Sequence, residues 1–328
     1  MDVETVQIRF SGWHTDFFQP CFILSQLVKF MSSVQPLVWH TTRFQIDLGQ
    51  PRVMGIVNVT PDSFSDGGQF FSPVSGMASA TAHCEQLVKD GADILDIGGE
   101  SSRPGAQPLS LAEELARVVP VVRHAVTLGV AVSVDTYKPE VMQVVLDLGA
   151  DIINDIWALR QAGACQVVAA HPGCGVCLMH MHREPQTMQS EPMQGDVVAQ
   201  VAAFLNHQAI TLEGIGVNRH RIMLDYGIGF GKTVEQNFAL LARQRELLAG
   251  GYPLLAGWSR KSSLAAVSST SLEQVAKLDM TDRMVPSVTA ALLAVERGAS
   301  VVRVHDVRQT VQALKVWSRV QAASKISD

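Results

Sequence analysis

The sequence lacks an excess of positive charge, and it lacks a long apolar run. It has 26 Lys and Arg against 31 Asp and Glu, a net charge of -5, so electrostatics gives no support for nucleic-acid binding. Its N-terminal apolar stretch, 17–30, contains Pro20 and Lys29 and is shorter than the ~20 apolar residues of a membrane-spanning helix. Asp2 and Glu4 stand where a secretory signal would be basic. We therefore expect a cytoplasmic protein that binds neither nucleic acids nor membranes.

Cysteine is also scarce, with five residues scattered along the chain. Cys174 and Cys177 have the spacing of a redox or zinc motif, and His180 and His182 follow them. A second cysteine pair is missing from the sequence, and Cys177 lies in an expected buried strand. We interpret these residues as thiols of the core, with a zinc site as the less favoured alternative.

What the sequence does contain is a repeated apolar run that ends in polar residues. Runs without period-2 alternation are typical of parallel strands buried on both faces, and stretches with helical spacing lie between them. Eight such repeats predict an α/β fold, a (β/α)₈ TIM barrel. A doubly wound open sheet is the alternative. The runs are 53–57, 94–97, 130–134, 152–153, 176–179, 222–224, 253–257 and 301–304.

The repeats leave both ends of the chain outside the barrel. We expect an N-terminal extension at 1–45, a single barrel domain at 46–322 and a C-terminal tail at 323–328. The polar segment that begins at Met31 is typical of a natural N-terminus, so we interpret residues 1–30 as the result of an early start-codon assignment, with an amphipathic helix or an organellar extension as the alternatives.

The segment 58–68 is the most informative loop. It follows the apolar run 53–57, and nearly all of its residues are polar, small or turn-forming. Loops between a strand and a helix usually have about 2–6 residues. A longer polar loop directly after a buried strand indicates a place for chemistry.

Other polar residues follow the remaining runs. Because active sites of (β/α)₈ barrels lie at the carboxyl ends of the strands, we expect these side chains to converge on one mouth. The residues at or just beyond strand ends are Asn58, Arg103, Asp135, Asn154, Asp225, Lys261, Arg303 and His305. Arg303 interrupts its own strand, and alternation places it opposite Val302 and Val304. A cation there requires an anionic partner or a wet cavity, which favours a functional role, and a purely structural salt bridge is the less favoured alternative.

The residue types at this mouth indicate the class of ligand. Arginine and lysine suit phosphate oxygens, whereas carboxylates and an amide suit a heterocycle with several N–H and carbonyl groups. We predict a small, ring-containing substrate with a phosphate or pyrophosphate, and the reaction stays open. The cations are Arg103, Lys232, Arg260, Lys261 and Arg303, and the other groups are Asp96, Asp135, Asp225 and Asn154.

Eight blocks of the sequence resemble, in order, the signature blocks of the dihydropteroate synthase family. The resemblance extends over about 52–320. The blocks are 58–68, 96–106, 133–141, 154–156, 178–181, 224–232, 259–262 and 301–307.

The resemblance implies a transferase of folate biosynthesis. Members condense 6-hydroxymethyl-7,8-dihydropterin pyrophosphate with p-aminobenzoate and release pyrophosphate and 7,8-dihydropteroate. It also implies a homodimer, a Mg²⁺ cofactor and inhibition by sulfonamides, which mimic p-aminobenzoate. The catalytic set that it implies is Asp135, Asp225, Lys261, Arg303 and His305.

The resemblance divides these residues among three subsites. The pterin would contact Asp135, Asn154, Asp225 and Lys261, with Met179 packed on its ring. The pyrophosphate would contact Asn58, Arg103, Arg303 and His305, with Asn58 also a Mg²⁺ ligand. The p-aminobenzoate would contact Phe64, Ser102, Arg103, Pro104, Phe230 and Ser262.

Some positions depart from the family pattern. Tyr226 replaces the usual Pro and adds bulk and a hydroxyl beside Asp225. Pro286 replaces a frequent Gly, and we expect it in the first turn of a helix that runs to Arg297. Two alternatives are kept. One is a methyltransferase-like pterin-binding barrel, and the other is a non-catalytic paralogue that acts as a binding or regulatory subunit.

Overall fold

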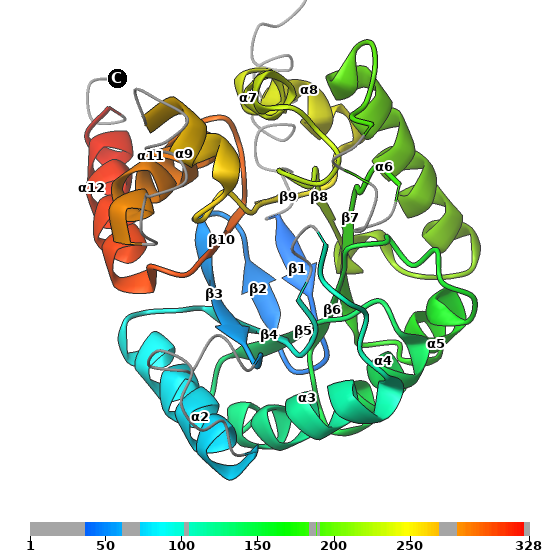
Figure 1. Cartoon of the computed structure of the whole chain (residues 1–328). Helices are drawn as coiled ribbons and strands as arrows, with labels where there is room; N and C mark the ends of the chain where they lie inside the picture. The colour runs from blue at the N-terminus through cyan, green and yellow to red at the C-terminus, as the bar shows by residue number, and fades with distance from the viewer. Residues whose placement is uncertain are drawn as a thin grey trace, which may run out of the picture. The chain divides into compact units, whose positions relative to one another are not determined.

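A closed barrel of eight parallel strands forms the centre of the protein (Figure 1). The computed structural model describes residues 37–60, 73–101, 105–183, 188, 191–268 and 281–324. The barrel confirms the predicted (β/α)₈ fold, and the open-sheet alternative is wrong. In barrel order the strands are β10 (Val301–Val304), β3 (Arg52–Asn58), β4 (Ile94–Gly98), β5 (Ala131–Asp135), β6 (Ile152–Asp155), β7 (Gly175–Met179), β8 (Ile222–Asp225) and β9 (Leu254–Ala256).

Helices surround the barrel (Figure 1). Ser110 begins α3 with a capping box, in which its side chain and that of Glu113 each bond the backbone of the other residue. Pro286 lies in the first turn of α11, as predicted. The α-helices are α2 (Pro73–Lys89), α3 (Leu111–Ala125), α4 (Pro139–Asp147), α5 (Ala164–Ala170), α6 (Val197–Gly214), α7 (Val234–Ala242), α8 (Gln244–Leu247), α9 (Ser262–Ser268), α11 (Met284–Glu296) and α12 (Val307–Ser324). Short 3₁₀ turns occur at η2 (Arg219–Arg221), η3 (Leu248–Gly250) and η4 (Thr281–Arg283).

Alternation along each strand divides the core into two parts. Residues such as Val302 and Val304 face outward and pack beneath the helices. Their neighbours face the barrel interior, where the layer nearest the strand N-termini is apolar. This inner layer comprises Met54, Ile94, Ala131, Ile152, Cys177, Met223, Leu255 and Val301. The next inward positions along the strands include the polar residues Asp96, Ser133, Asn154 and Arg303, so a polar layer lies directly above the apolar one.

A hairpin closes the barrel beneath that floor. β1 (Val38–His40) and β2 (Gln45–Asp47) pair antiparallel, and in Figure 1 they lie across the centre of the ring. Trp39 joins the inner apolar cluster and donates its indole N–H to the carbonyl of Arg221 at 2.9 Å. Arg43 lies 2.6 Å from the buried Asp151. The hairpin spans the boundary expected at residue 46, and residues 1–36 lie outside the described residues.

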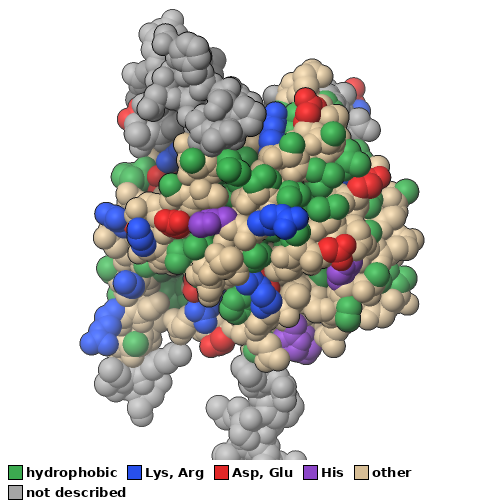
Figure 2. All heavy atoms as spheres, turned by 90° about the horizontal axis from the view of Figure 1, so that it is seen from below, with side chains coloured by type: hydrophobic (Ala, Val, Ile, Leu, Met, Phe, Trp, Pro, Cys, Tyr) green, Lys and Arg blue, Asp and Glu red, His purple; other side chains and the backbone are tan. Residues whose placement is uncertain are grey.

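The outer surface is mixed in character. In Figure 2, side chains of both charges are interspersed with apolar ones over one side of the molecule. Among the described residues, each helix is too short or too polar to cross a membrane.

Candidate active site at the mouth of the barrel

The polar layer inside the barrel is held together by Arg303. Its Nε donates to Asp96 Oδ2 at 2.5 Å, and a terminal nitrogen donates to Asp135 Oδ2 at 2.9 Å. The side-chain N–H of Asn154 also donates to Asp96 Oδ2, at 3.2 Å. Four strands therefore contribute to one network. The anionic partner expected for Arg303 is confirmed, in the form of two carboxylates.

Asp96 is a member of this network to which the sequence analysis gave no subsite. It lies between Leu95 and Ile97 in a fully buried strand, so the alternation that identified Arg303 also identifies Asp96. Its second oxygen, Oδ1, is buried and has no hydrogen-bond partner among the described residues, and the same holds for the hydroxyl of Ser133, the residue beside it on β5. Buried polar atoms are rarely left unpaired. Two such atoms on neighbouring strands fit a bound ligand with its own N–H and carbonyl groups.

Burial and neighbouring charge shift the pKa of Asp135 and of Arg303. Burial raises the pKa of Asp135 to about 7, with Asp96 acting in the same direction and Arg303 opposing it. Burial opposes the charge of Arg303, but Asp96 and Asp135 outweigh it and raise the pKa of the guanidinium. Burial thus favours the neutral form of Asp135, and the guanidinium of Arg303 favours its carboxylate.

Asp225 ends β8 and begins a glycine-rich turn. Its Oδ1 accepts the N–H of Gly227 at 2.7 Å. Gly227 has φ +65°, and a side chain at this position would collide with the carbonyl of His180, so only glycine permits the turn. Burial raises the pKa of Asp225, and the Gly227 bond and Lys261 oppose that shift. The carboxylate is therefore fixed by backbone geometry next to the polar layer.

Lys232, which the sequence analysis placed among the cations suited to phosphate, donates to backbone carbonyls of the loops after β7 and β8. It is buried, and its Nζ donates to the carbonyls of Gly227 at 2.8 Å, Phe230 at 3.2 Å and His180 at 3.3 Å. Its Nζ also lies 3.0 Å from Nδ1 of His180. Lys232 ties the turn after β8 to the residues after β7. Lys232 lies in a loop, where the sequence has no helical or strand periodicity, so the sequence alone did not predict that its side chain is buried.

Lys261 and Phe230 are in contact, and the charge of Lys261 acts on Asp225. The ammonium of Lys261 is 4.2 Å from the centroid of the Phe230 ring, within the range of a cation–π contact. Burial lowers the pKa of Lys261 to about 8, Arg303 adds to the shift, and Asp225 opposes it. Phe230 packs with Met179 in a buried apolar cluster. Ser262, also predicted for the site, is exposed at the start of α9.

Tyr226 faces away from the site. Its side chain is buried in the outer core. Its hydroxyl donates to Gln244 Oε1 at 2.8 Å and accepts the indole N–H of Trp258 at 3.2 Å. The expectation that Tyr226 adds bulk beside Asp225 is wrong, because the residue after a strand points to the opposite face from the strand's last residue.

The two residues predicted to bind pyrophosphate on β10 and its loop, Arg303 and His305, lie on one face. His305 is half-buried and contacts Ser259 through its Nδ1 at 2.9 Å. Arg260, expected to be a mouth cation, pairs with Asp306 at 2.7 Å. Asn58 is half-buried at the end of β3. Phe64, Ser102, Arg103 and Pro104 lie outside the described residues.

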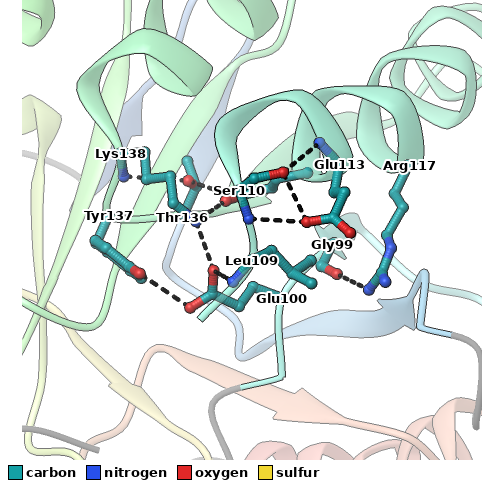
Figure 3. Close-up of polar contacts among 10 residues, drawn as sticks. Gly99, Glu100, Leu109, Ser110, Glu113, Arg117, Thr136, Tyr137 and Lys138 are labelled. Atoms are coloured by element: carbon teal, nitrogen blue, oxygen red, sulfur yellow. Dashed lines mark hydrogen bonds and ion pairs between the residues drawn. The ribbon is translucent and has the colours of Figure 1, made fainter. Parts of the chain in front are cut away.

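A second polar network lies at the rim between β4 and β5 (Figure 3). Lys138 contacts Glu100 and Glu114, each at 2.5 Å. Glu100 also accepts the hydroxyl of Tyr137 and the backbone N–H of Leu109, both at 3.0 Å. Burial opposes the charge of Lys138, but the two carboxylates outweigh it and raise its pKa. The network ties residues that flank 102–104 to the segment after Asp135.

The burial of Cys174 and Cys177 supports their interpretation as thiols of the core. Cys174 and Cys177 are free and buried, and burial raises the pKa of both thiols. Among the described residues, the His, Cys, Asp and Glu side chains form no group of three that could hold a metal ion.

Comparisons with known proteins agree with this geometry. The sequence profile of the family described as pterin binding enzyme matches residues 54–305. A dihydropteroate synthase of Neisseria meningitidis serogroup B is 47% identical over 284 residues, which cover 85% of this chain and 96% of that protein. Among solved structures, a dihydropteroate synthase of Xanthomonas albilineans with 4-aminobenzoic acid has a TM-score of 0.79 and 44% identity, covering 88% of this chain and 99% of that one. The enzyme of Burkholderia cenocepacia complexed with 7,8-dihydropteroate has a TM-score of 0.78 and 47% identity, covering 88% and 98% of the two chains.

Proposed function

This chain belongs to the pterin binding enzyme family, as one of its dihydropteroate synthases, and from that premise we propose how its residues act. The reaction joins 6-hydroxymethyl-7,8-dihydropterin pyrophosphate to p-aminobenzoate. The bond between the pterin methylene carbon and the pyrophosphate oxygen breaks, a carbon–nitrogen bond forms, and the arylamine loses a proton. The products are 7,8-dihydropteroate and pyrophosphate.

The pterin occupies the polar layer inside the barrel. One observation carries this assignment, namely the buried Asp96 Oδ1 with no partner beside the Arg303 network. Asp135, Asn154 and Asp225 supply further acceptors and an amide for the N–H and carbonyl groups of the ring. Lys261 donates from the opposite side, and Met179 packs on the ring face. Both Asp135 and Asp225 also stabilise positive charge that develops on the pterin as the leaving group departs.

The pyrophosphate lies above this layer, against Arg303 and His305, with Arg103 as a further contact. These groups act most strongly as negative charge develops on the leaving oxygens. The amide oxygen of Asn58 suits Mg²⁺, which commonly takes one or two protein oxygens and completes its ligands with phosphate and water. When bound, the ion neutralises charge on the pyrophosphate.

The arylamine approaches from the side of Phe230. The ring of Phe230, with Lys261 over its face, offers a flat apolar contact for p-aminobenzoate, and the exposed Ser262 offers a hydroxyl for its carboxylate. Phe64, Ser102, Arg103 and Pro104 are assigned to the same subsite on the resemblance alone. Exclusion of water by these groups favours attack by the amine over hydrolysis.

We also propose a cytoplasmic homodimer. The described cysteines are all free thiols, as is usual for proteins of reducing compartments. Four apolar side chains are exposed on the neighbouring helices α11 and α12, and contiguous apolar surface is typical of subunit interfaces. They are Val285, Leu293, Val316 and Val320. Sedimentation of the wild-type chain and of Val316→Glu tests the dimer, since the charged variant is expected to dissociate.

A coupled assay for pyrophosphate tests the function. Release is expected only when the dihydropterin pyrophosphate and p-aminobenzoate are both present, in step with formation of 7,8-dihydropteroate. Pterin binding without pyrophosphate release would favour the non-catalytic paralogue. Transfer of a methyl group from a reduced folate, with no use of the pyrophosphate, would favour the methyltransferase-like barrel.

A further inference from the structure

Ser259 and His305 are joined by two contacts across neighbouring strands. Ser259 follows β9 and His305 follows β10, and these strands pair in the barrel. The hydroxyl of Ser259 lies 2.9 Å from Nδ1 of His305. The backbone N–H of His305 donates to the same hydroxyl oxygen at 3.1 Å. Ser259 is buried, so water does not easily replace either contact.

These contacts decide where the hydroxyl hydrogen points. A hydroxyl group can donate one hydrogen bond and accept two. The backbone N–H of His305 can only donate, so it occupies one of the two acceptor positions of the Ser259 oxygen. Within the described part of the chain, Nδ1 is the other partner of this oxygen. If Nδ1 carried the hydrogen, the oxygen would accept twice and its own buried hydrogen would lack an acceptor, which is unfavourable. The hydroxyl therefore donates to the lone pair of Nδ1.

A second pair of residues keeps this contact in place. Arg260 and Asp306, which follow Ser259 and His305 in the chain, form an ion pair with contacts at 2.7 and 3.2 Å. The backbone N–H of Arg260 is also held by the hydroxyl of Ser287 at 2.9 Å. Arg260 has φ +59°, a conformation that non-glycine residues adopt rarely and only where surrounding contacts impose it. The two loops are thus tied together at two successive positions.

We propose that Ser259 is a positioning residue that holds His305 as the neutral tautomer with hydrogen on Nε2, and that this Nε2–H donates to the leaving pyrophosphate. In a neutral imidazole, the hydrogen bond at one nitrogen decides which nitrogen carries the hydrogen. The opposite tautomer would turn a lone pair toward anionic oxygens. The identity of the ligand rests on the proposed function, whereas the tautomer rests on the Ser259 contacts.

The first test reads the tautomer directly. We would label histidine with ¹⁵N, identify the His305 signals from a His305→Gln variant, and record ¹⁵N shifts near pH 8.5, where an ordinary imidazole with a pKa of about 6.5 is neutral. The wild-type protein is expected to show hydrogen on Nε2. Ser259→Ala is expected to shift the population toward hydrogen on Nδ1, and Ser259→Thr, which keeps the hydroxyl, to retain the wild-type tautomer. Hydrogen on Nδ1 in the wild-type protein would overturn the proposal, whether or not any variant folds.

The second test links the tautomer to the reaction. Ser259→Ala is expected to lower kcat by about 10- to 100-fold, the effect typical of losing a partner that orients a functional histidine, with the KM for p-aminobenzoate unchanged. Ser318→Ala on α12 is the matched control and should leave kcat unchanged. An unchanged kcat in Ser259→Ala would overturn the proposal.

Addition of inorganic pyrophosphate tests the identity of the ligand separately from the tautomer of His305. The addition is expected to shift the Nε2 signal of His305 in the wild-type protein. If hydrogen lies on Nε2 but pyrophosphate leaves the signal unchanged, the named ligand is wrong, and the assignment of His305 in the proposed function fails with it.

Discussion

The Nε of Arg303 lies 2.5 Å from Asp96 Oδ2, although the two residues are 207 positions apart in the chain. The same guanidinium contacts Asp135. A residue assigned to the pyrophosphate thus also binds two carboxylates of the layer assigned to the pterin. Its loss is therefore expected to affect both subsites.

Replacing Arg303 with Ala is expected to lower turnover by ~10²–10³-fold, the usual effect of losing an electrostatic donor to a developing anion. From the sequence alone, binding of a pterin without pyrophosphate would be expected to survive. The structure predicts that it weakens as well, because Arg303 holds down the pKa of Asp135. Arg303→Lys, which keeps the charge, should retain more of both functions. Steady-state kinetics and calorimetry with the unphosphorylated pterin measure the two effects, and intact turnover in Arg303→Ala would contradict the assignment.

Asp225→Asn tests the pterin pocket separately. The substitution keeps the size of the side chain but replaces a carboxylate that accepts the Gly227 N–H with an amide. We expect weaker binding of the unphosphorylated pterin, by about 10-fold or more, since hydrogen bonds to charged groups contribute ~1.5–3 kcal/mol. Calorimetry measures this affinity directly. Unchanged pterin affinity would place the ring elsewhere.

The buried Lys232 predicts a pH dependence of stability. Burial lowers its pKa from 10.5 to about 7. Between these values the unfolded chain binds more protons than the folded chain, so the contribution of Lys232 to the free energy of unfolding rises as the pH rises from 7 to 10.5. Urea unfolding of the wild-type protein and Lys232→Met at several pH values measures the difference, with the exposed Lys315→Met as control. A difference that stays constant from pH 7 to pH 10 would contradict this prediction.

Tyr226→Phe is expected to lower stability without changing pterin binding. The substitution removes the hydroxyl that joins Gln244 and Trp258 and leaves a buried amide oxygen without its donor, at a cost of about 1–3 kcal/mol. Tyr226→Pro, the residue usual in the family, should cost more because it also leaves a cavity. Thermal unfolding and pterin calorimetry check both statements. Weaker pterin binding in Tyr226→Phe would show that the side chain does influence Asp225.

Sulfonamides test the arylamine subsite. Because these drugs mimic p-aminobenzoate, sulfamethoxazole is expected to compete with p-aminobenzoate at the Phe230 side of the mouth, and its inhibition should not be relieved by excess pterin substrate. Initial rates at varied concentrations of each substrate distinguish the patterns. No inhibition at drug concentrations well above the KM for p-aminobenzoate would count against this assignment.

The amino-acid sequence by itself determined the barrel and the direction from which its site opens. Apolar runs such as 53–57 and 301–304 mark strands buried on both faces, and the polar residue that ends each run, as with Asp225, must lie at the same mouth. The alternation of side chains along one strand was enough to predict that Arg303 faces the interior of the barrel. These are local properties, set by the strand's two-residue period and by burial.

The tertiary structure alone decided which groups pair inside that mouth. Nothing near Lys232 in the sequence shows that its ammonium is enclosed by the carbonyls of two loops, and nothing near Tyr226 shows that its hydroxyl meets Trp258. The contact of Ser259 with His305 likewise joins residues 46 positions apart. Such pairings depend on where separate strands and loops come together when the barrel closes. Hydrogen-bond partners and local dielectric, which then set charge and tautomer, follow from that closure.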